Sequence, residues 1–472
     1  MKLTSSKKSL IFAVFVLPAI AVFSNFYTSP ATAQAQPEQA TAEALSMGEH
    51  FTVLVSERDF NTVKQSLAVI EKQWSPSLVP MALEVLAYTR SNTVEKTLTD
   101  LLVKETGENH IQNFNRWYTW LWQHDIKPSP DYANFKSRLY RIVDPVFEGY
   151  FRDRQETARI RLDEIRWGGV GQDGIPPLRN PKMLKANEAH YLQDSNIVFG
   201  IKINGDARAY PKRVLAWHEM FTDTIGGVKI AGVYCTLCGT VIPYRTEHKG
   251  VSYELGTSGF LYRSNKLMYD KATQSLWSTE RGEPVLGDLV DKGIALEYES
   301  VVTTTWGEWK KRHPETTVLS RNTGHIRNYT EGFAYAEYFA TDQLMFNTPF
   351  NDQRLKNKQE ILALRFAAAP NEQLAIDTEF LSNNPVYRNK IGRQEFIVFT
   401  DKTGANRVYD PKDVSFTEYD GGQVALDDKG VQWQVGEESL VASDGRELSR
   451  LPYHRAFWFG WHAAFPQTQL VK

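Results

Sequence analysis

The sequence is short of cysteine, of net charge and of long apolar runs. Only two of its 472 residues are cysteine, and its formal net charge is −2. Two cysteines exclude a disulfide framework as the source of stability for so long a chain, so stability must come from a buried core. A net charge near zero argues against a nucleic-acid partner. No segment after the N-terminus is apolar enough to predict a membrane span.

The N-terminus has the three parts of a secretory signal peptide. A basic lead, "MKLTSSKK", precedes the apolar run "SLIFAVFVLPAIAVF", and "TAQA" ends in small residues typical of a cleavage site. Pro18 interrupts the apolar run, which is shorter than the roughly 20 residues of a membrane span. We therefore predict a signal peptide over residues 1–35, with a retained anchor as the alternative, and an exported mature chain that is periplasmic or secreted.

A helical segment is expected to follow a polar linker. The linker covers residues 36–50, and in "FNTVKQSLAVIEKQW" and "SLVPMALEVLAYTR" apolar residues recur at helical spacing. We predict a helical domain over residues 51–165. Its helix pairs resemble HEAT-type repeats, whose usual role is packing or contact with a protein partner.

The pattern changes at "RWGGVGQDGIPPLRNPKM", which is too rich in glycine and proline for a regular element. Beyond it, short alternating runs such as "IVFGIKING", "VKIAGVY" and "TVIPYRTE" are separated by turn signals at Asn204-Gly205, Gly226-Gly227 and Lys249-Gly250. These predict hairpin strands, with a helix over "YPKRVLAWHEMFTD". The fold class is therefore α+β, with a strand-rich domain over residues 166–345.

Residues 346–472 echo part of that domain. "IVFGIKING" and "AWHEMFTDTIGGVKIAGVYC" align with "EILALRFAA" and "SNNPVYRNKIGRQEFIVFTD". The alignment puts Asn384 in the place of His218 and Asp401 in the place of Cys235. We predict a degenerate second copy that lacks the thiols and the histidine, which favours a functional role for those residues in the first copy.

Both cysteines lie in one stretch, "VYCTLCGTVIPY", as Cys235 and Cys238. The β-branched residues and proline after Cys238 predict a returning strand, whereas a thioredoxin-type pair needs a helix there. A strand, a Cys-x-x-Cys-Gly turn and a second strand resemble the metal-binding knuckle of rubredoxin-like and zinc-ribbon sites. Gly239 would permit the turn, and two thiolates would bind one ion.

One knuckle supplies only two ligands. His218 is the expected third, and Met268 is a candidate soft ligand; this set favours copper or zinc over magnesium or calcium. His325 and His454 are further candidates without a local argument.

Two other functions stay open. In a periplasmic thiol-disulfide oxidoreductase, one cysteine would attack a disulfide, His218 would help to deprotonate it and the other cysteine would resolve the product. In a non-enzymatic interaction protein, the cysteines would form a structural disulfide and the helical domain would dock a partner. A serine hydrolase at Ser258 is disfavoured, because one glycine is out of place for a nucleophile elbow. Ser258 also lacks a partner unless His218 and either Glu219 or Asp223 converge on it.

Several motifs together resemble one family: "DGIPPLRNPKM", "INGDARAYP", "WHEMFTDTIGG", "YCTLCG", "SGFLYRSNKLMYD", "SLWS" and "TTTWGEWKKRHPET". They are similar to the uncharacterised family called domain of unknown function 3179. The resemblance names no substrate, but it implies site positions and places Thr236 where members often have proline. The implied positions are His218, Cys235, Cys238, Gly239, Ser258, Tyr262, Asn265 and Met268; we expect Ser258, Tyr262 and Asn265 to line a pocket near the thiols.

Overall fold

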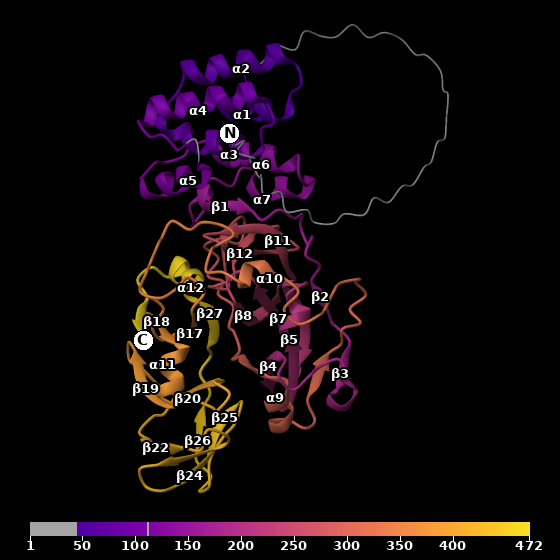
Figure 1. Cartoon of the computed structure of the whole chain (residues 1–472), viewed down its shortest axis with the longest axis vertical. Helices are drawn as coiled ribbons and strands as arrows, with labels where there is room; N and C mark the ends of the chain where they lie inside the picture. Colours follow the sequence, from indigo (N-terminus) through magenta and orange to yellow (C-terminus); the bar gives the residue numbers. More distant parts are fainter. Residues whose placement is uncertain (1–44, 111–112) are drawn as a thin grey trace, which may run out of the picture. The chain divides into compact units, whose positions relative to one another are not determined.

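The structure is a computed structural model that describes residues 45–110 and 113–472. The predicted signal peptide and the first part of the linker lie outside these residues. Over the described ranges, no helix has both the length and the apolar character needed to cross a bilayer. The predicted class is confirmed, since helices come first and β sheets follow (Figure 1).

The helical part begins at Met47, a few residues before the predicted start. Ser46 caps the first helix, where its hydroxyl accepts from the backbone of Glu49 and the Glu49 carboxylate accepts in return from the backbone of Ser46. The helices are α1 (Met47–Ser56), α2 (Phe60–Lys72), α3 (Val79–Tyr88), α4 (Asn92–Thr106), α5 (Phe114–Gln123), α6 (Tyr132–Arg141) and α7 (Glu148–Phe151).

These helices share their apolar core with a five-stranded sheet. Phe260 of that sheet packs edge-on against Tyr140 and Phe147, with ring centroids 4.9 Å and 4.7 Å apart. The shared core ties the helices to the strands. The sheet has the order β1 (Ile165–Trp167), β11 (Leu255–Tyr262), β12 (Asn265–Asp270), β13 (Leu276–Ser278) and β14 (Glu283–Leu286).

Two further sheets and a small hairpin complete the first strand-rich part. One sheet has the order β15 (Val302–Thr305), β4 (Ile197–Ile203), β5 (Asp206–Pro211), β16 (Thr317–Leu319) and β3 (Met183–Lys185). The other has the order β2 (Leu178–Arg179), β6 (Met220–Ile225), β7 (Val228–Cys235) and β8 (Thr240–Arg245). The small hairpin pairs β9 (Glu247–His248) with β10 (Val251–Ser252).

The predicted turn signals connect these strands. Asn204-Gly205 joins β4 to β5, Gly226-Gly227 joins β6 to β7, and Lys249-Gly250 joins β9 to β10. Every residue of the three pairs has a positive φ, between 49° and 83°. Two central residues with positive φ are what a type I′ hairpin turn requires, so the three turn predictions are confirmed.

The predicted helix over residues 210–223 is wrong for most of its length. Strand β5 extends to Pro211, α8 (Lys212–Leu215) is a single turn, and β6 begins at Met220. His218 therefore lies in the loop between α8 and β6 and not on a helix. The apolar residues of this stretch come in short runs, which buried strands and short helices share.

The C-terminal part contains three sheets. The first has the order β27 (His454–Phe457), β17 (Glu360–Arg365), β18 (Gln373–Asp377) and β28 (Gln469–Val471). The second has the order β19 (Val386–Ile391), β20 (Gln394–Thr400) and β21 (Asn406–Tyr409). The third has the order β22 (Phe416–Tyr419), β23 (Val424–Asp427), β24 (Gln432–Val435), β25 (Ser439–Ala442) and β26 (Glu447–Ser449). The helices of the strand-rich parts are α8, α9 (Trp306–Arg312), α10 (Ala336–Phe339), α11 (Thr378–Asn383) and α12 (Trp458–Ala464).

One strand pattern occurs in both strand-rich parts. The run β15-β4-β5-β16 and the run β27-β17-β18-β28 each contain two antiparallel pairings followed by a parallel one. The helix after the first strand of each run carries a buried tryptophan with the same contact. Trp309 Nε1 donates to Thr316 Oγ1, and Trp461 Nε1 donates to Thr468 Oγ1, both over 2.9 Å.

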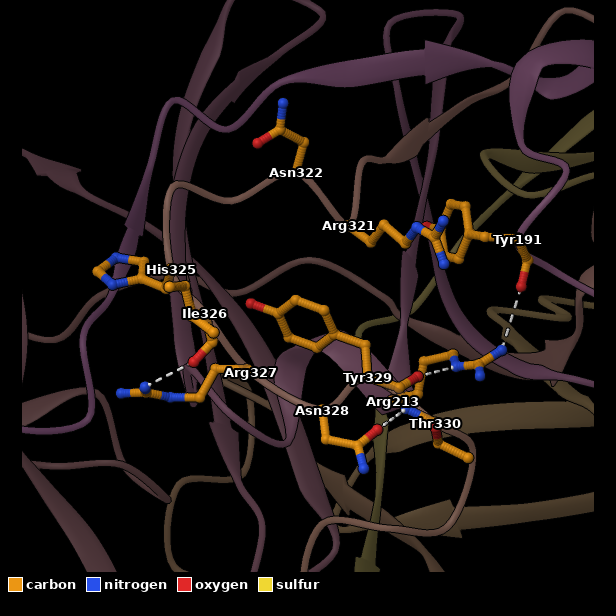
Figure 2. A pocket seen from close by; sticks show the side chains of 10 residues that line it. All are labelled: Tyr191, Arg213, Arg321, Asn322, His325, Ile326, Arg327, Asn328, Tyr329 and Thr330. Carbon is orange, nitrogen blue, oxygen red and sulfur yellow. Dashed lines mark hydrogen bonds between the residues drawn. The ribbon is translucent and has the colours of Figure 1, made fainter. Parts of the chain in front are cut away.

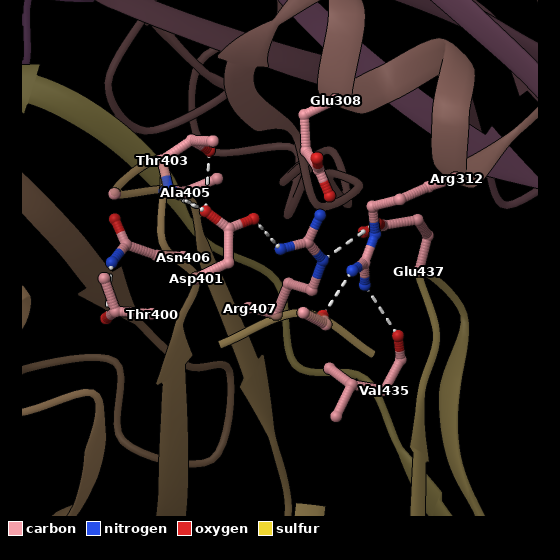
Figure 3. A network of polar contacts seen from close by, with 12 residues as sticks. Glu308, Arg312, Thr400, Asp401, Thr403, Ala405, Asn406, Arg407, Val435 and Glu437 are labelled. Carbon is pink, nitrogen blue, oxygen red and sulfur yellow. Dashed lines mark hydrogen bonds and ion pairs between the residues drawn. The ribbon is translucent and has the colours of Figure 1, made fainter. Parts of the chain in front are cut away.

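A buried charge network joins α9 to the C-terminal part (Figure 3). Fully buried Arg407 donates to Asp401 over 2.9 Å and to Glu437 over 2.8 Å. Arg312 of α9 approaches Glu437 to 3.4 Å and donates to the carbonyl of Val435 over 2.8 Å. Burial alone would raise the pKa of Glu437, but Arg407 holds it well below its usual range. The network is therefore charged, and among the described residues Arg407 Nη2 is left without a hydrogen-bond partner.

Candidate functional site

The two cysteines lie in a hairpin turn, as the sequence predicts. Strand β7 ends at Cys235, which pairs with Thr240 at the start of β8. Gly239 has a φ of 62°, and a Cβ there would lie 2.9 Å from the ring of Phe457. Only glycine fits both constraints without strain.

The two sulfurs are joined in a disulfide. The Cα atoms of Cys235 and Cys238 lie 5.2 Å apart, within the usual range for a disulfide, and the S–S distance is 2.18 Å. Both residues are buried, with 2% of Cys235 and none of Cys238 exposed. In this state neither cysteine presents the thiolate that a metal would bind.

A small cavity of about 70 Å³ lies against the turn. Its walls include Cys235 and, from neighbouring elements, Glu219 and Lys266, whereas Cys238 is not part of its lining. This volume holds a few water-sized groups, since one water needs about 10–15 Å³. Cys235 is therefore the sulfur that a small reactant in the cavity would meet.

Lys266 and Glu219 form a buried ion pair in that cavity. Their exposed fractions are 6% and 5%, and the Lys266 ammonium contacts the Glu219 carboxylate directly. The hydroxyl of Tyr335 donates to the same carboxylate over 3.0 Å. Desolvation lowers the pKa of Lys266, although the attraction of Glu219 opposes the shift. An ammonium with a lowered pKa is a better proton donor than an ordinary lysine.

Side-chain oxygens near the turn have no hydrogen-bond partner among the described residues. They are Thr236 Oγ1, Ser264 Oγ and Asn265 Oδ1. Cys238 Sγ lies 3.5 Å from the Ser264 carbonyl oxygen, and Asn265 Nδ2 donates to the Gly460 carbonyl over 2.9 Å. Buried polar atoms without a protein partner usually bind water or a ligand. The surroundings of the disulfide are therefore polar.

One wall of the cavity comes from residues 335–346, here called the cover. Tyr335, Met345 and Phe346 line it, and all three come from the segment around α10. In the same segment Tyr338 donates to the carbonyl of Leu237, inside the cysteine turn, over 2.8 Å. The cover is thus held to the turn itself.

His218 is buried and both of its ring nitrogens are occupied. Nδ1 lies 2.8 Å from the Pro176 carbonyl oxygen and Nε2 lies 2.6 Å from the Tyr329 hydroxyl. Burial lowers the pKa of His218 to about 4, so the ring is neutral at pH 7. A metal bond to His218 would have to replace one of these hydrogen bonds. Over the described ranges, no three His, Cys, Asp or Glu side chains are grouped so that they could hold an ion.

The other predicted site residues lie in different surroundings. Met268 is fully buried in an apolar core that also contains Val233 and Ile242. Ser258 Oγ donates to the Leu267 carbonyl over 2.6 Å, which satisfies it within the sheet. Tyr262 packs against the core that the helices share with β11. Of the implied pocket residues, Asn265 is the one next to the cysteine turn.

Sequence reasoning missed Lys266, Glu219 and the cover. Both charged residues lie inside quoted motifs, "NKLMYD" and "WHEM". The available signal was Lys266 itself, because it lies in a strand whose six residues are all buried and lysine is rarely buried without a partner.

The chain belongs to the family described as "Protein of unknown function (DUF3179)", which matches residues 172–468. The predicted family is therefore confirmed, and the match includes the C-terminal part. The comparisons with curated proteins and with solved structures found no similar protein.

Proposed function

We propose that this member of the DUF3179 family is an exported thiol-disulfide oxidoreductase whose reactive group is the Cys235–Cys238 disulfide. The observation that carries the proposal is the position of Cys235 in a cavity that it shares with the buried pair Lys266–Glu219. Cationic groups beside a cysteine stabilise its thiolate and so favour exchange. A purely structural disulfide needs neither a cavity nor a buried lysine.

The proposed reaction oxidises a dithiol. A substrate thiolate attacks Cys235 Sγ, the bond between the two cysteines breaks, and Cys238 leaves as a thiolate. The second substrate thiolate then attacks the first substrate sulfur, the bond from that sulfur to Cys235 breaks, and Cys235 leaves. The substrate gains a disulfide, the protein gains two thiols, and the two substrate protons end on them. Lys266 gives a proton to Cys235 as it leaves and takes one back from the substrate thiol, and Glu219 keeps the Lys266 ammonium in place.

We also infer that the two strand-rich parts are copies of one unit, as the sequence echo predicts. The shared strand pattern and the matching tryptophan contacts support this. At the position of Cys235 the second copy has Asp401, whose carboxylate accepts from the backbone of Thr403 and Ala405. Hydrogen bonds suffice to form that turn, so cysteines in the first copy serve a purpose beyond folding.

Two other functions remain predictions. Reduced Cys235 and Cys238 with His218 would bind copper or zinc, and a HEAT-like helical part would dock a protein partner. Elemental analysis of the reduced mature chain tests the first, since about one copper or zinc per chain would favour the metal site.

Substitution of Cys238 by serine is expected to leave a reactive thiol at Cys235. After incubation with oxidised glutathione, mass spectrometry should find a glutathione adduct on Cys235. The control is Cys235→Ser, whose remaining thiol does not line the cavity and should react at least about tenfold more slowly, because it has neither the opening nor the cationic neighbour that Cys235 has there. Equal rates for the two variants, or no adduct on Cys235, would argue against the proposal.

Substitution of Tyr338 by phenylalanine is expected to speed reduction of the disulfide by dithiothreitol. The change removes the hydrogen bond from the cover to Leu237, worth about 1 kcal/mol, which corresponds to about a fivefold higher opening constant. The rate is measured by thiol release. Tyr387→Phe in β19 is the control and should leave the rate unchanged; an unchanged rate in Tyr338→Phe would mean that the cover does not limit access.

A further inference from the structure

A second, larger pocket of about 470 Å³ lies beside His218, and neither cysteine lines it (Figure 2). The loop of residues 321–330 supplies most of its walls, and Tyr191 and Arg213 supply the rest. Figure 2 shows Arg321 against Tyr191 on one side, His325 and Arg327 on the other, and the ring of Tyr329 between them. The pocket is thus bounded by cationic, amide and aromatic side chains.

The lining contains three arginines and no acidic residue. Arg213 is occupied, since it donates to the carbonyl oxygens of Tyr329 and Tyr191 and holds the loop in place. Among the described residues, Arg321 and Arg327 have no carboxylate within ion-pair distance. Arg321 lies 5.9 Å from the centre of the Tyr191 ring. Neither arginine has an acidic partner in the described part of the chain, although Arg327 donates to the carbonyl of Ile326 over 3.0 Å, and the two line one concave space from opposite sides (Figure 2).

A partly buried chain of hydrogen bonds fixes the shape of this loop. The Pro176 carbonyl can only accept, so His218 Nδ1 carries the proton and Nε2 accepts from the Tyr329 hydroxyl. The Tyr329 oxygen then accepts from Thr323 Oγ1 over 2.7 Å. Burial keeps His218 neutral, which preserves these directions at pH 7. Tyr329 is thereby fixed at the centre of the pocket.

We propose that this pocket binds a small molecule carrying an oxyanion group, a phosphate or a carboxylate, through Arg321 and Arg327. Planar guanidinium groups bind both oxyanions by paired hydrogen bonds, and the side-chain amides of Asn322 and Asn328 add donors. The volume exceeds that of a bare ion, so the ligand has an organic body that lies against the Tyr329 ring. His218 is a positioning residue for this site.

The test is isothermal titration calorimetry of the mature chain at low salt with inorganic phosphate, glucose 6-phosphate, succinate and, as the neutral comparison, glucose. We expect saturable 1:1 binding of at least one of the anions, weaker at higher salt, and none of glucose. Arg321→Gln and Arg327→Gln should each weaken binding at least about tenfold. Lys310→Gln, on α9 and paired with Asp194, is the matched control and should not. The anion that binds most tightly distinguishes phosphate from carboxylate ligands.

His218→Gln should weaken the same binding while leaving the fold intact by circular dichroism, and Tyr329→Phe should do the same. The proposal is overturned if no anion binds saturably, or if both arginine variants bind as the unchanged chain does. Cys235→Ser with Cys238→Ser should not alter this binding. Failure here and failure of the proposed redox function can therefore be told apart.

Discussion

Replacing Lys136 by methionine is expected to lower the free energy of unfolding by about 3–5 kcal/mol. The Lys136 ammonium lies 2.5 Å from the Glu84 carboxylate, and both side chains are buried. It also donates to the carbonyl of Ile165 in β1, over 2.9 Å. Removal of the cation leaves the carboxylate buried with only the hydroxyls of Tyr132 and Tyr140 as donors. Removing both charges should lower the free energy of unfolding less than removing one, because no unpaired charge then stays buried.

Urea denaturation followed by tryptophan fluorescence measures this change. The matched control is Lys96→Met, which breaks an exposed pair with Asp100 and should cost less than about 1 kcal/mol. The double variant Lys136→Met with Glu84→Gln should recover part of the loss. A loss below about 1 kcal/mol for Lys136→Met would mean that its ion pair with Glu84 is not buried away from water as the structure has it.

The unchanged chain is expected to lose stability as pH rises through 7, and the variant Glu280→Gln is expected to lack this loss. Burial raises the pKa of Glu280 to about 7, with Arg365 opposing the shift only in part. Neither carboxylate oxygen has a hydrogen-bond partner among the described residues. The folded chain thus holds a proton that the unfolded chain releases near pH 4.5. Stability from this group is present below pH 4.5 and is lost as pH rises through 7.

The size of the effect follows from the shift. A rise from 4.5 to about 7 corresponds to about 3 kcal/mol between pH 4.5 and pH 8. Urea denaturation of both chains at a series of pH values should show their difference in stability change by about that amount. Exposed Glu247→Gln is the control, with a difference that stays nearly constant. A constant difference for Glu280→Gln would show that this carboxyl is ionised inside the folded chain without cost.

The local parts of the fold could be predicted from the sequence. The Asn-Gly, Gly-Gly and Lys-Gly turns and the cysteine hairpin each depend on residues within a few positions of one another. A short apolar stretch such as residues 210–223 is ambiguous, because buried strands and helices place apolar residues at overlapping positions. In the structure, the pairing of β5 with β4 and of β6 with β7 makes most of that stretch strand.

The site itself depends on contacts that no local pattern reports. His218 and Tyr329 are 111 positions apart, and Tyr338 reaches Leu237 across 101 positions. Lys266 meets Glu219 only because β12 and the loop before β6 reach the same cavity. Partners so distant in sequence are set by the packing of whole sheets, so the motifs could not predict these contacts.

The most direct test of the central claim is a redox titration of the mature chain in glutathione buffers, with Cys235 and Cys238 counted by thiol labelling. Under the proposed function the Lys266 ammonium stabilises negative charge on Cys235, so we predict that the pair equilibrates with glutathione, at a reduction potential above about −300 mV. A pair that stays fully oxidised in every glutathione buffer would be a structural disulfide and would contradict the account.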